Sequence, residues 1–169
     1  MEDAQLPDGP FEAAAAIIIN VEGAAAFRDL IQSGKVADLS DPLGQISGYL
    51  NAQIPADDYM RALQVRGICQ VKVDELFEKF DVLAAPTLPV AASALDTNLE
   101  KDLNFPDPLG AIGNLCGLPA VSVPCGFTSA KLPIGIQFLA RAREDAKAIA
   151  AGRTYQEHSD WHTKRPPIS

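Results

Sequence analysis

The pattern of apolar and polar positions predicts that the first part of the chain is mainly helical. Residues 11–33 form a long apolar-rich stretch, with Pro10 as a start signal and Gly34 as a stop signal, so we expect one helix there. Its middle, residues 13–19, is apolar nearly all round, which predicts a buried helix. Residues 35–53 are polar and rich in turn formers, and they predict no regular element.

A second long helix is predicted from Pro55 to about residue 80. Its apolar residues recur three or four positions apart and form one stripe, made of Ala62, Val65, Cys69, Val73, Leu76 and Phe80. Gly67 lies inside this stretch, where a glycine costs about 1 kcal/mol relative to alanine. We therefore expect Gly67 to mark a close crossing with another element.

Beyond Phe80 the pattern changes to short apolar runs. Residues 82–85 form a run that Pro86 stops, which is typical of a buried strand that ends at a loop. Residues 120–123 and 134–139 are two more runs, and the turn formers over 128–133 predict that they make a hairpin.

Two further helices complete the second half. A short one is predicted over residues 109–116, ending at Gly117, and a last one over residues 144–158. Residues 90–108 show no period and predict a long surface excursion.

The element order predicts an α/β fold with a few strands covered by helices. The strands are apolar on both faces, as in the middle of a larger mixed sheet, but the pattern does not contain the rest of such a sheet. The length of 169 residues predicts one domain over 1–169, mainly helical over 1–80 and with strands and helices over 81–169.

Composition and charge narrow the classes of partner. An apolar fraction of 47% is typical of a globular protein. A formal charge of −8 without any Lys/Arg cluster argues against nucleic acid or an anionic membrane as the partner. Residues 11–26 are interrupted by Glu12 and Glu22, so we expect no membrane span. Three cysteines without paired spacing, and no positively charged leader, predict a soluble cytoplasmic protein.

Candidate nucleophiles exist but lack the residues that would activate them. Cys125 lies between Pro124 and Gly126, an arrangement that suits an exposed turn, yet its only possible histidine bases are His158 and His162 near the C-terminus. A small core residue is the more common role for such a cysteine. Ser122 lacks a Gly-x-Ser-x-Gly motif and is predicted to be a strand residue. Neither a phosphate-binding motif nor a metal-ligand spacing occurs, so we expect no cofactor and no metal.

Several segments together resemble the amidase signature family. The strongest are Asn-Leu-Cys-Gly-Leu-Pro-Ala-Val-Ser-Val-Pro-Cys-Gly at 114–126, Leu-Pro-Ile-Gly-Ile-Gln-Phe at 132–138 and Phe-Asp-Val-Leu-Ala-Ala-Pro-Thr at 80–87. The ending at 160–166 is similar too, and the first half matches less tightly, for example over 56–62. The resemblance covers nearly the whole chain but only the last third of such an enzyme.

The resemblance implies an amide hydrolase whose catalytic residues lie outside this sequence. Members of that family use a Ser-Ser-Lys triad, with the serines in a Gly/Ser-rich motif, or pass ammonia onward as amidotransferase subunits. No Gly-Gly-Ser-Ser-Gly-like stretch occurs here, so no catalytic residue is assigned. The resemblance implies a substrate-pocket role for Asp107, Asn114 and Cys116. Gly44 stands where the amidotransferase subunits carry a substrate-binding Arg, which argues against glutamine-type specificity.

The first hypothesis is therefore the C-terminal segment of an amidase signature enzyme. It would contribute sheet core and part of the pocket for a small amide, and it would be inactive alone. Strands cut from a larger sheet expose unpaired edges, so we expect the chain to associate with itself or with an N-terminal amidase portion. The alternatives are a stand-alone assembly or binding module that kept this fold and a cysteine hydrolase that uses Cys125.

Overall fold

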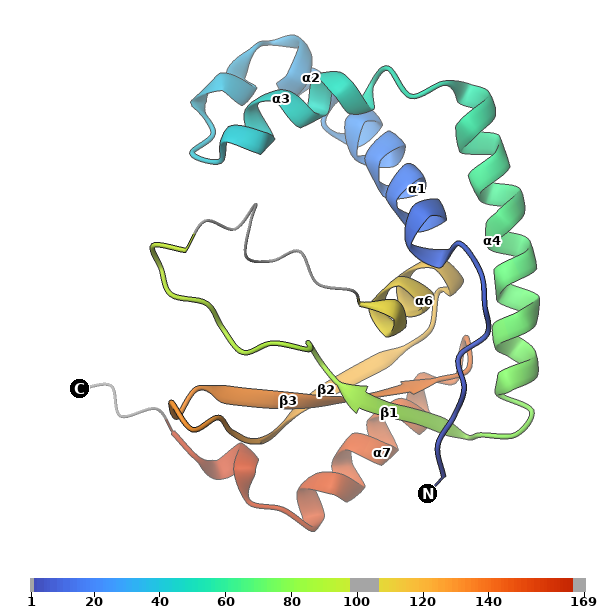
Figure 1. Cartoon of the computed structure of the whole chain (residues 1–169), viewed down its shortest axis with the longest axis vertical. Coiled ribbons are helices and arrows are strands. Elements are labelled where there is room, and N and C mark those ends of the chain that lie inside the picture. Colours follow the sequence, from blue (N-terminus) through green and yellow to red (C-terminus); the bar gives the residue numbers. More distant parts are fainter. Residues whose placement is uncertain (1, 98–106, 166–169) are drawn as a thin grey trace. The chain divides into compact units, whose positions relative to one another are not determined.

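A computed structural model describes residues 2–97 and 107–165 of the chain. The chain divides into two compact units, which we treat separately (Figure 1). The helical unit comprises Asp8–Val71, and the sheet unit comprises Met1–Pro7 together with Lys72–Ser169. The proposal of a single domain over 1–169 stays a prediction.

The helical unit is built from short helices, and their bounds differ from the pattern-based expectation. Its elements are α1 (Phe11–Ala26), α2 (Arg28–Gln32), the 3₁₀ turn η1 (Lys35–Asp38), α3 (Pro42–Asn51) and the first part of α4 (Ala56–Leu76). Helix α3 packs against both α1 and η1.

The single helix predicted over 11–33 is wrong, because the chain breaks at Phe27. This residue adopts φ −99° and ψ 20°, and helix α2 begins directly after it. The break brings Ile31 into the core, where its side chain is only 8% exposed. Burial of this isoleucine is a tertiary effect, and nothing in the local apolar pattern marks it.

The prediction that residues 35–53 lack regular structure is also wrong. The Asp41 carboxylate caps α3 by accepting hydrogen bonds from the backbone N–H groups of Leu43 (3.3 Å) and Gly44 (2.9 Å). Pro42 follows at the first helical position, which suits its fixed φ. An Asp-Pro pair is a strong helix start signal, and it outweighs the polar composition of the stretch.

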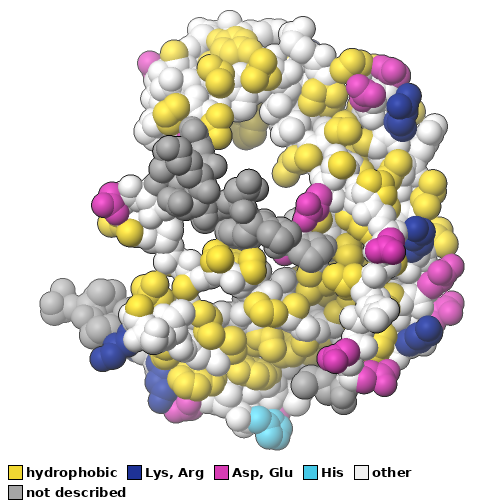
Figure 2. Space-filling view, viewed as in Figure 1, with side chains coloured by type: hydrophobic (Ala, Val, Ile, Leu, Met, Phe, Trp, Pro, Cys, Tyr) yellow, Lys and Arg dark blue, Asp and Glu magenta, His cyan; other side chains and the backbone are white. Residues whose placement is uncertain are grey.

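The expected burial of α1 on most sides is wrong for the described residues. Only Phe11 and Ala14 of this helix are buried, and Ile19 is 69% exposed. Several apolar side chains of α3 are exposed as well, and Figure 2 shows apolar side chains at the surface of the segment that holds α1–α3. The described residues therefore leave parts of this unit's apolar surface uncovered.

The apolar stripe of α4 is confirmed at its centre. Ala62, Cys69 and Val73 are each at most 4% exposed. The close crossing expected at Gly67 is wrong, because a Cβ atom built on Gly67 would meet nothing within 4 Å. Gly67 lies on the exposed side of the helix, away from the buried stripe.

The sheet unit contains a three-stranded antiparallel sheet. Its strands are β1 (Val82–Pro86), β2 (Ala120–Phe127) and β3 (Pro133–Ala140), in the order β1-β3-β2. The strand after Phe80 and the hairpin are both confirmed. The β2–β3 register shifts between Pro124 and Gly126, so Cys125 is the extra residue of a β-bulge. Among the described residues, β1 and β2 each have one edge without a strand partner.

Helices lie on both faces of this sheet. Helix α7 (Asp145–Glu157) packs on the face that carries Val121 and Phe138, and the ring centroids of Phe138 and Tyr155 are 5.8 Å apart (Figure 1). Helix α6 (Pro108–Cys116) approaches the opposite face, where a Cβ on Gly113 would lie 3.2 Å from Leu139. It ends, as predicted, at Gly117, whose φ of 71° favours glycine.

The prediction that both sheet faces are buried is wrong within the described part of the chain. Along β2, Ala120, Ser122 and Pro124 are exposed on the α6 side, whereas Val123 is buried on the α7 side. Helix α6 covers only the end of that face near Leu139. The short turn η2 (Trp161–Thr163) follows α7, and Trp161 packs edge-on against Phe127.

Part of the expected excursion over 90–108 falls outside the described residues. Residues 90–97 contain neither helix nor strand, as expected, and α6 begins at Pro108. Within the part of the chain that the structure describes, no helix is long and apolar enough to cross a membrane.

Candidate functional site

A groove of about 810 Å³ follows the unpaired edge of β1 in the sheet unit. It is lined by every residue of β1, by Phe80 and Pro89, by Asp107 and Leu109 of the α6 segment, by Phe138 and Ala151, and by Glu2, Asp3, Ala4 and Leu6. The lining is mainly apolar, with carboxylates as its charged groups. Such a groove can hold an extended chain along the strand edge or an uncharged apolar group.

Asp107 has a structural role at one end of this groove. Its carboxylate caps α6 by accepting a hydrogen bond from the Gly110 N–H at 3.0 Å. A Cβ atom on residue 110 would lie 2.1 Å from the Asp107 Oδ2 atom, so the cap requires glycine there. The Asp-Pro start at 107–108 repeats the arrangement that begins α3.

The structure does not bring the three predicted pocket residues together. Asn114 lies near the other end of α6, roughly 10 Å along the helix axis from Asp107. Cys116 follows two positions later, about 200° around the helix, so the two side chains point in different directions. Accordingly Asn114 is exposed and Cys116 is only 4% exposed. Only Asp107 of the three lines the groove.

A polar cluster beside the groove was not predicted. The hydroxyl oxygens of Thr87 and Ser122 lie 2.5 Å apart, and they face each other across Gly135 of the central strand. A Cβ on residue 135 would lie 2.7 Å from the Thr87 hydroxyl and 3.1 Å from the Ser122 hydroxyl. The Gln137 side-chain amide donates to the Pro86 carbonyl at 3.1 Å, and Pro86 lines the groove. We call Thr87, Ser122 and Gln137 the sheet-face cluster.

This cluster can bind a polar group but holds no activated nucleophile. A serine becomes a nucleophile when a base removes its proton, and the hydrogen bonds described for Ser122 reach only Thr87. Cys125 is half-buried at the bulge, and within the described residues no hydrogen bond joins it to a histidine. The His158 Nδ1 atom lies 2.9 Å from the Thr154 carbonyl oxygen instead.

Ion pairs surround the other end of the sheet. Arg141, directly after β3, binds the Asp74 carboxylate of α4 with two guanidinium nitrogens, and its Nε–Oδ1 distance is 2.5 Å. This hydrogen bond lowers the pKa of Asp74 below its usual value and raises that of Arg141. Lys147 lies 2.9 Å from Glu144 and 3.1 Å from Asp81, and these carboxylates raise the pKa of its ammonium group.

No metal centre forms among residues 2–97 and 107–165. Within these residues, no three or more His, Cys, Asp or Glu side chains gather in a way that could hold a metal ion.

One protein family matches most of this sequence. The family model Amidase matches residues 8–149, which is most of the chain. The chain belongs to the amidase family. The resemblance noted from residues 80–87, 114–126 and 132–138 is thereby confirmed, and so is the α/β fold of amidase signature enzymes.

The relatives found by sequence are much longer than this amidase chain. A glutamyl-tRNA(Gln) amidotransferase subunit from Psychrobacter sp. is 40% identical over 119 residues, covering 70% of this chain and 23% of that relative. The corresponding protein from Methanosarcina barkeri is 39% identical over 111 residues, covering 64% of this chain and 23% of that relative. The chain corresponds to the C-terminal part of these proteins and spans about a quarter of their length.

Solved structures show the same partial correspondence. A chain of a vestigial protein complex, described as revealing the evolutionary origins of an s-triazine catabolic enzyme, is 26% identical with a TM-score of 0.81, covering 98% of this chain and 38% of that chain. A bacterial aryl acylamidase of the amidase signature family has a TM-score of 0.71 at 23% identity, covering 98% of this chain and 38% of its own, which shows the shared fold.

The sequence carried one usable signal for the sheet-face cluster. Ser122 and Gln137 are isolated polar residues inside otherwise apolar strands, and Thr87 follows a strand directly. Such interruptions indicate positions where a polar side chain has a partner or a ligand. That the three meet across Gly135 depends on strand order and register, which the pattern does not contain.

Proposed function

We propose that this chain supplies the C-terminal part of an amide-hydrolysing amidase signature enzyme and hydrolyses no amide by itself. Two observations support the proposal together. The sequence contains no Gly-Gly-Ser-Ser-Gly-like motif, and the described sheet has three strands with an open edge on each side. In this proposal the nucleophile and the lysine lie on a preceding amidase portion, in a reducing cytoplasm, and no cofactor is needed.

The proposed partner of the strand edges is that N-terminal amidase portion. An unpaired strand edge presents free N–H and C=O groups and pairs readily with another strand. In the absence of the N-terminal portion, we propose that the same edges pair two copies of this chain. Light scattering on a size-exclusion column measures the solution mass directly. We expect the chain to be a dimer by itself and to form a one-to-one complex when the N-terminal portion is added. A monomeric chain that does not bind the added portion would contradict this.

The proposed contribution to the substrate pocket comes from the α6 segment. Asp107 lies at the groove, Asn114 is exposed near the end of α6, and Cys116 is buried at that end. Gly44 occupies the place of the substrate-binding Arg of amidotransferase subunits, so the proposed substrate is a small amide other than a glutamine side chain. The sheet-face cluster offers hydroxyl and amide groups that can hydrogen-bond such a substrate.

The test combines a serine-directed probe with a complementation assay. The chain alone should remain unlabelled by a fluorophosphonate and should release no acid from an aryl amide. Mixed with the part of the Psychrobacter amidotransferase protein that precedes the matched region, it should restore labelling of that portion and hydrolysis. A companion portion whose nucleophilic serine is replaced by alanine is the matched control.

Each result of this test has a defined meaning. Labelling of the 169-residue chain alone would refute the proposal. A stable complex that never hydrolyses an amide would instead favour a non-catalytic assembly module. Rapid alkylation of Cys125 by iodoacetamide at neutral pH, together with amide hydrolysis by the chain alone, would favour the cysteine hydrolase.

A further inference from the structure

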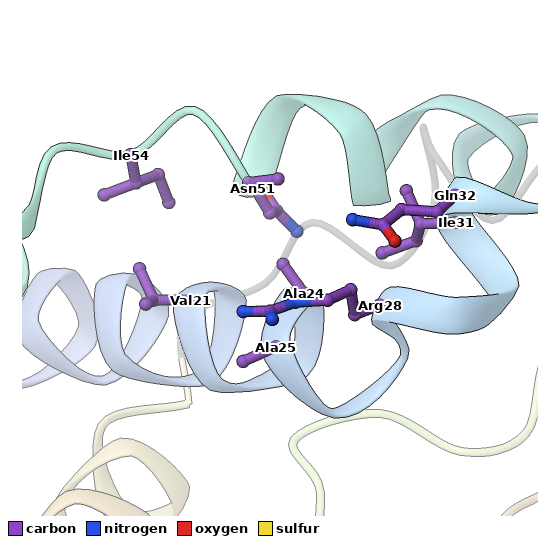
Figure 3. A pocket seen from close by; sticks show the side chains of 9 residues that line it. Val21, Ala24, Ala25, Arg28, Ile31, Gln32, Asn51 and Ile54 are labelled. Carbon is purple, nitrogen blue, oxygen red and sulfur yellow. The ribbon is translucent and has the colours of Figure 1, made fainter.

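A second pocket lies wholly within the helical unit and belongs to none of the features above. Its volume is about 380 Å³, and α1, α2 and the end of α3 enclose it (Figure 3). Val21, Ala24 and Ala25 line it from α1, at positions three and four residues apart that share one helix face, and Arg28 lines it from the start of α2. Small alanines form the floor, which leaves room above them.

The polar groups of this pocket are a guanidinium and two amides. The Arg28 side chain runs along α1 toward Val21, and the Asn51 and Gln32 side chains lie opposite it (Figure 3). Among the described residues, no acidic side chain lines the pocket, and no hydrogen bond or ion pair holds the Arg28 guanidinium. One side-chain amide N–H of Asn51 donates a hydrogen bond to the Asn20 Oδ1 atom at 3.4 Å.

The nearby carboxylates are turned to other partners or to solvent. The Glu22 carboxylate accepts a hydrogen bond from the Tyr59 hydroxyl at 2.9 Å. Asp29 is the chain neighbour of Arg28 and is exposed, but it does not line the pocket. Arg28 is therefore the charged residue that lines the pocket and can contact a bound ligand.

The remaining walls are apolar and in part rigid. Ile31 is 8% exposed and packs so closely on α3 that a Cβ on Gly48 would lie 2.8 Å from its Cγ1 atom. Ile54 forms the rim at the other end of the pocket. A ligand that fits must combine an anionic group with an apolar body, and the volume suits one small molecule.

We propose that this pocket binds a small monocarboxylate with an apolar tail of about six carbons, or with one aromatic ring. The planar guanidinium of Arg28 matches a carboxylate with two parallel hydrogen bonds, and an amide N–H of Asn51 or Gln32 completes its coordination. A phosphate dianion suits the pocket less, because one arginine neutralises one charge and the chain carries a net charge of −8. The tail lies over Ala24 and against Ile31.

The test is a titration of the full ¹⁵N-labelled chain with sodium hexanoate, followed by NMR. Saturable shifts are expected at the Arg28 Nε–H signal and at the side-chain amides of Asn51 and Gln32. Benzoate should give the same pattern. Acetate should bind at least tenfold more weakly because it has no tail, and hexanamide should not shift the Arg28 signal because it has no charge.

Two variants separate the charge from the apolar wall. Arg28→Met should weaken hexanoate binding at least tenfold, which corresponds to about 1.4 kcal/mol. Ala24→Leu fills the floor, so hexanoate should then bind no better than acetate. Arg61→Met removes an exposed arginine of α4 in the same unit and is the matched control, for which no change is expected.

The backbone spectrum of each variant shows whether it still folds. Arg28 is exposed, so its replacement should leave the fold intact. Equal shifts with acetate and hexanoate, unchanged hexanoate binding in Arg28→Met, or an equal loss in Arg61→Met would each overturn the proposal. The titration is independent of amide hydrolysis, so its outcome does not depend on the function proposed above.

Discussion

Gly152 determines how closely α7 approaches the sheet, and replacing it with alanine tests this packing. A Cβ atom at residue 152 would lie 2.9 Å from Val121 Cγ1 and 3.5 Å from Val123 Cγ1. Overpacking of this kind costs about 1–3 kcal/mol, and the β-branched Val121 has few rotamers with which to avoid the contact. Alanine also favours a helix over glycine by about 1 kcal/mol. We expect Gly152→Ala to lower the free energy of unfolding by about 1 kcal/mol.

Gly67→Ala is the matched control for this change. It makes the same substitution in another helix, at a site where the added Cβ meets nothing within 4 Å. Helix propensity then acts alone, and we expect a gain of up to about 1 kcal/mol. Combining Gly152→Ala with Val121→Ala removes the obstructing methyl groups, so in that background the glycine substitution should also be stabilising.

Urea unfolding followed by the fluorescence of Trp161 measures the differences at Gly152 and Val121 in the sheet unit, and far-UV circular dichroism measures the difference at Gly67 in the helical unit. Trp161 is the only tryptophan of the chain and packs on Phe127 in the sheet unit, so its signal reports on the sheet with α7. The reasoning would be refuted if Gly152→Ala stabilised the protein as much as Gly67→Ala does. It would also be refuted if the cost of Gly152→Ala were the same with and without Val121→Ala.

Three other predictions concern single interactions. The Arg141 hydrogen bond lowers the pKa of Asp74 below its ordinary 3.8, so the ion pair stabilises the fold fully above pH 3.8 and is lost as the pH falls through the lowered pKa. Asp74→Asn should therefore lower the urea midpoint at pH 7, and its difference from the parent chain should shrink as the pH falls below 3.8. Asp107→Ala should cost about 1 kcal/mol through loss of the helix cap, whereas Asp107→Asn should retain most of it, as chemical denaturation would show. Gly48→Ala should destabilise the chain by about 1 kcal/mol, because its Cβ would meet the buried Ile31, and the thermal midpoint should fall by a few degrees.

The sheet-face cluster connects the packing of the sheet unit to its proposed role. A hydroxyl pair and a glutamine amide occupy a face that is otherwise apolar, and that face is exposed in the described residues. Polar groups on a sheet face that a larger fold buries must find partners there, because unpaired buried polar atoms are costly. Here the two hydroxyls pair with each other and the Gln137 amide pairs with the Pro86 carbonyl, so only their remaining hydrogen-bonding capacity is open to the proposed N-terminal portion or to a substrate.

The local pattern was sufficient for the second half of the chain. Short apolar runs bounded by prolines and glycines predicted β1, β2 and β3, and the hairpin followed from the turn formers between the last two. The end of α6 followed from Gly117, since only glycine adopts its left-handed backbone without cost. In these segments the local signals and the tertiary packing favour the same structure.

The pattern failed where burial of one side chain decided the backbone. The chain breaks at Phe27 and Ile31 of the following helix is buried, and a continuous apolar stretch does not reveal such a break. Helix α3 was missed because its composition is mixed, although Asp41 and Pro42 are a recognisable start. Residues 13–19 are apolar nearly all round, but burial depends on neighbouring elements, and the described residues leave most of α1 unburied.

Patterns among residues that are close along the chain predict the elements of the sheet unit, the apolar stripe of α4 and the resemblance to the amidase family. Each of these depends only on the order of residues within a short segment. Contacts between distant residues required the folded chain. Strand order joins Thr87 to Ser122 across Gly135, and helix packing brings Arg28 opposite Asn51. Such contacts depend on register and on the approach of one helix to another, and the same local pattern is compatible with several arrangements of both.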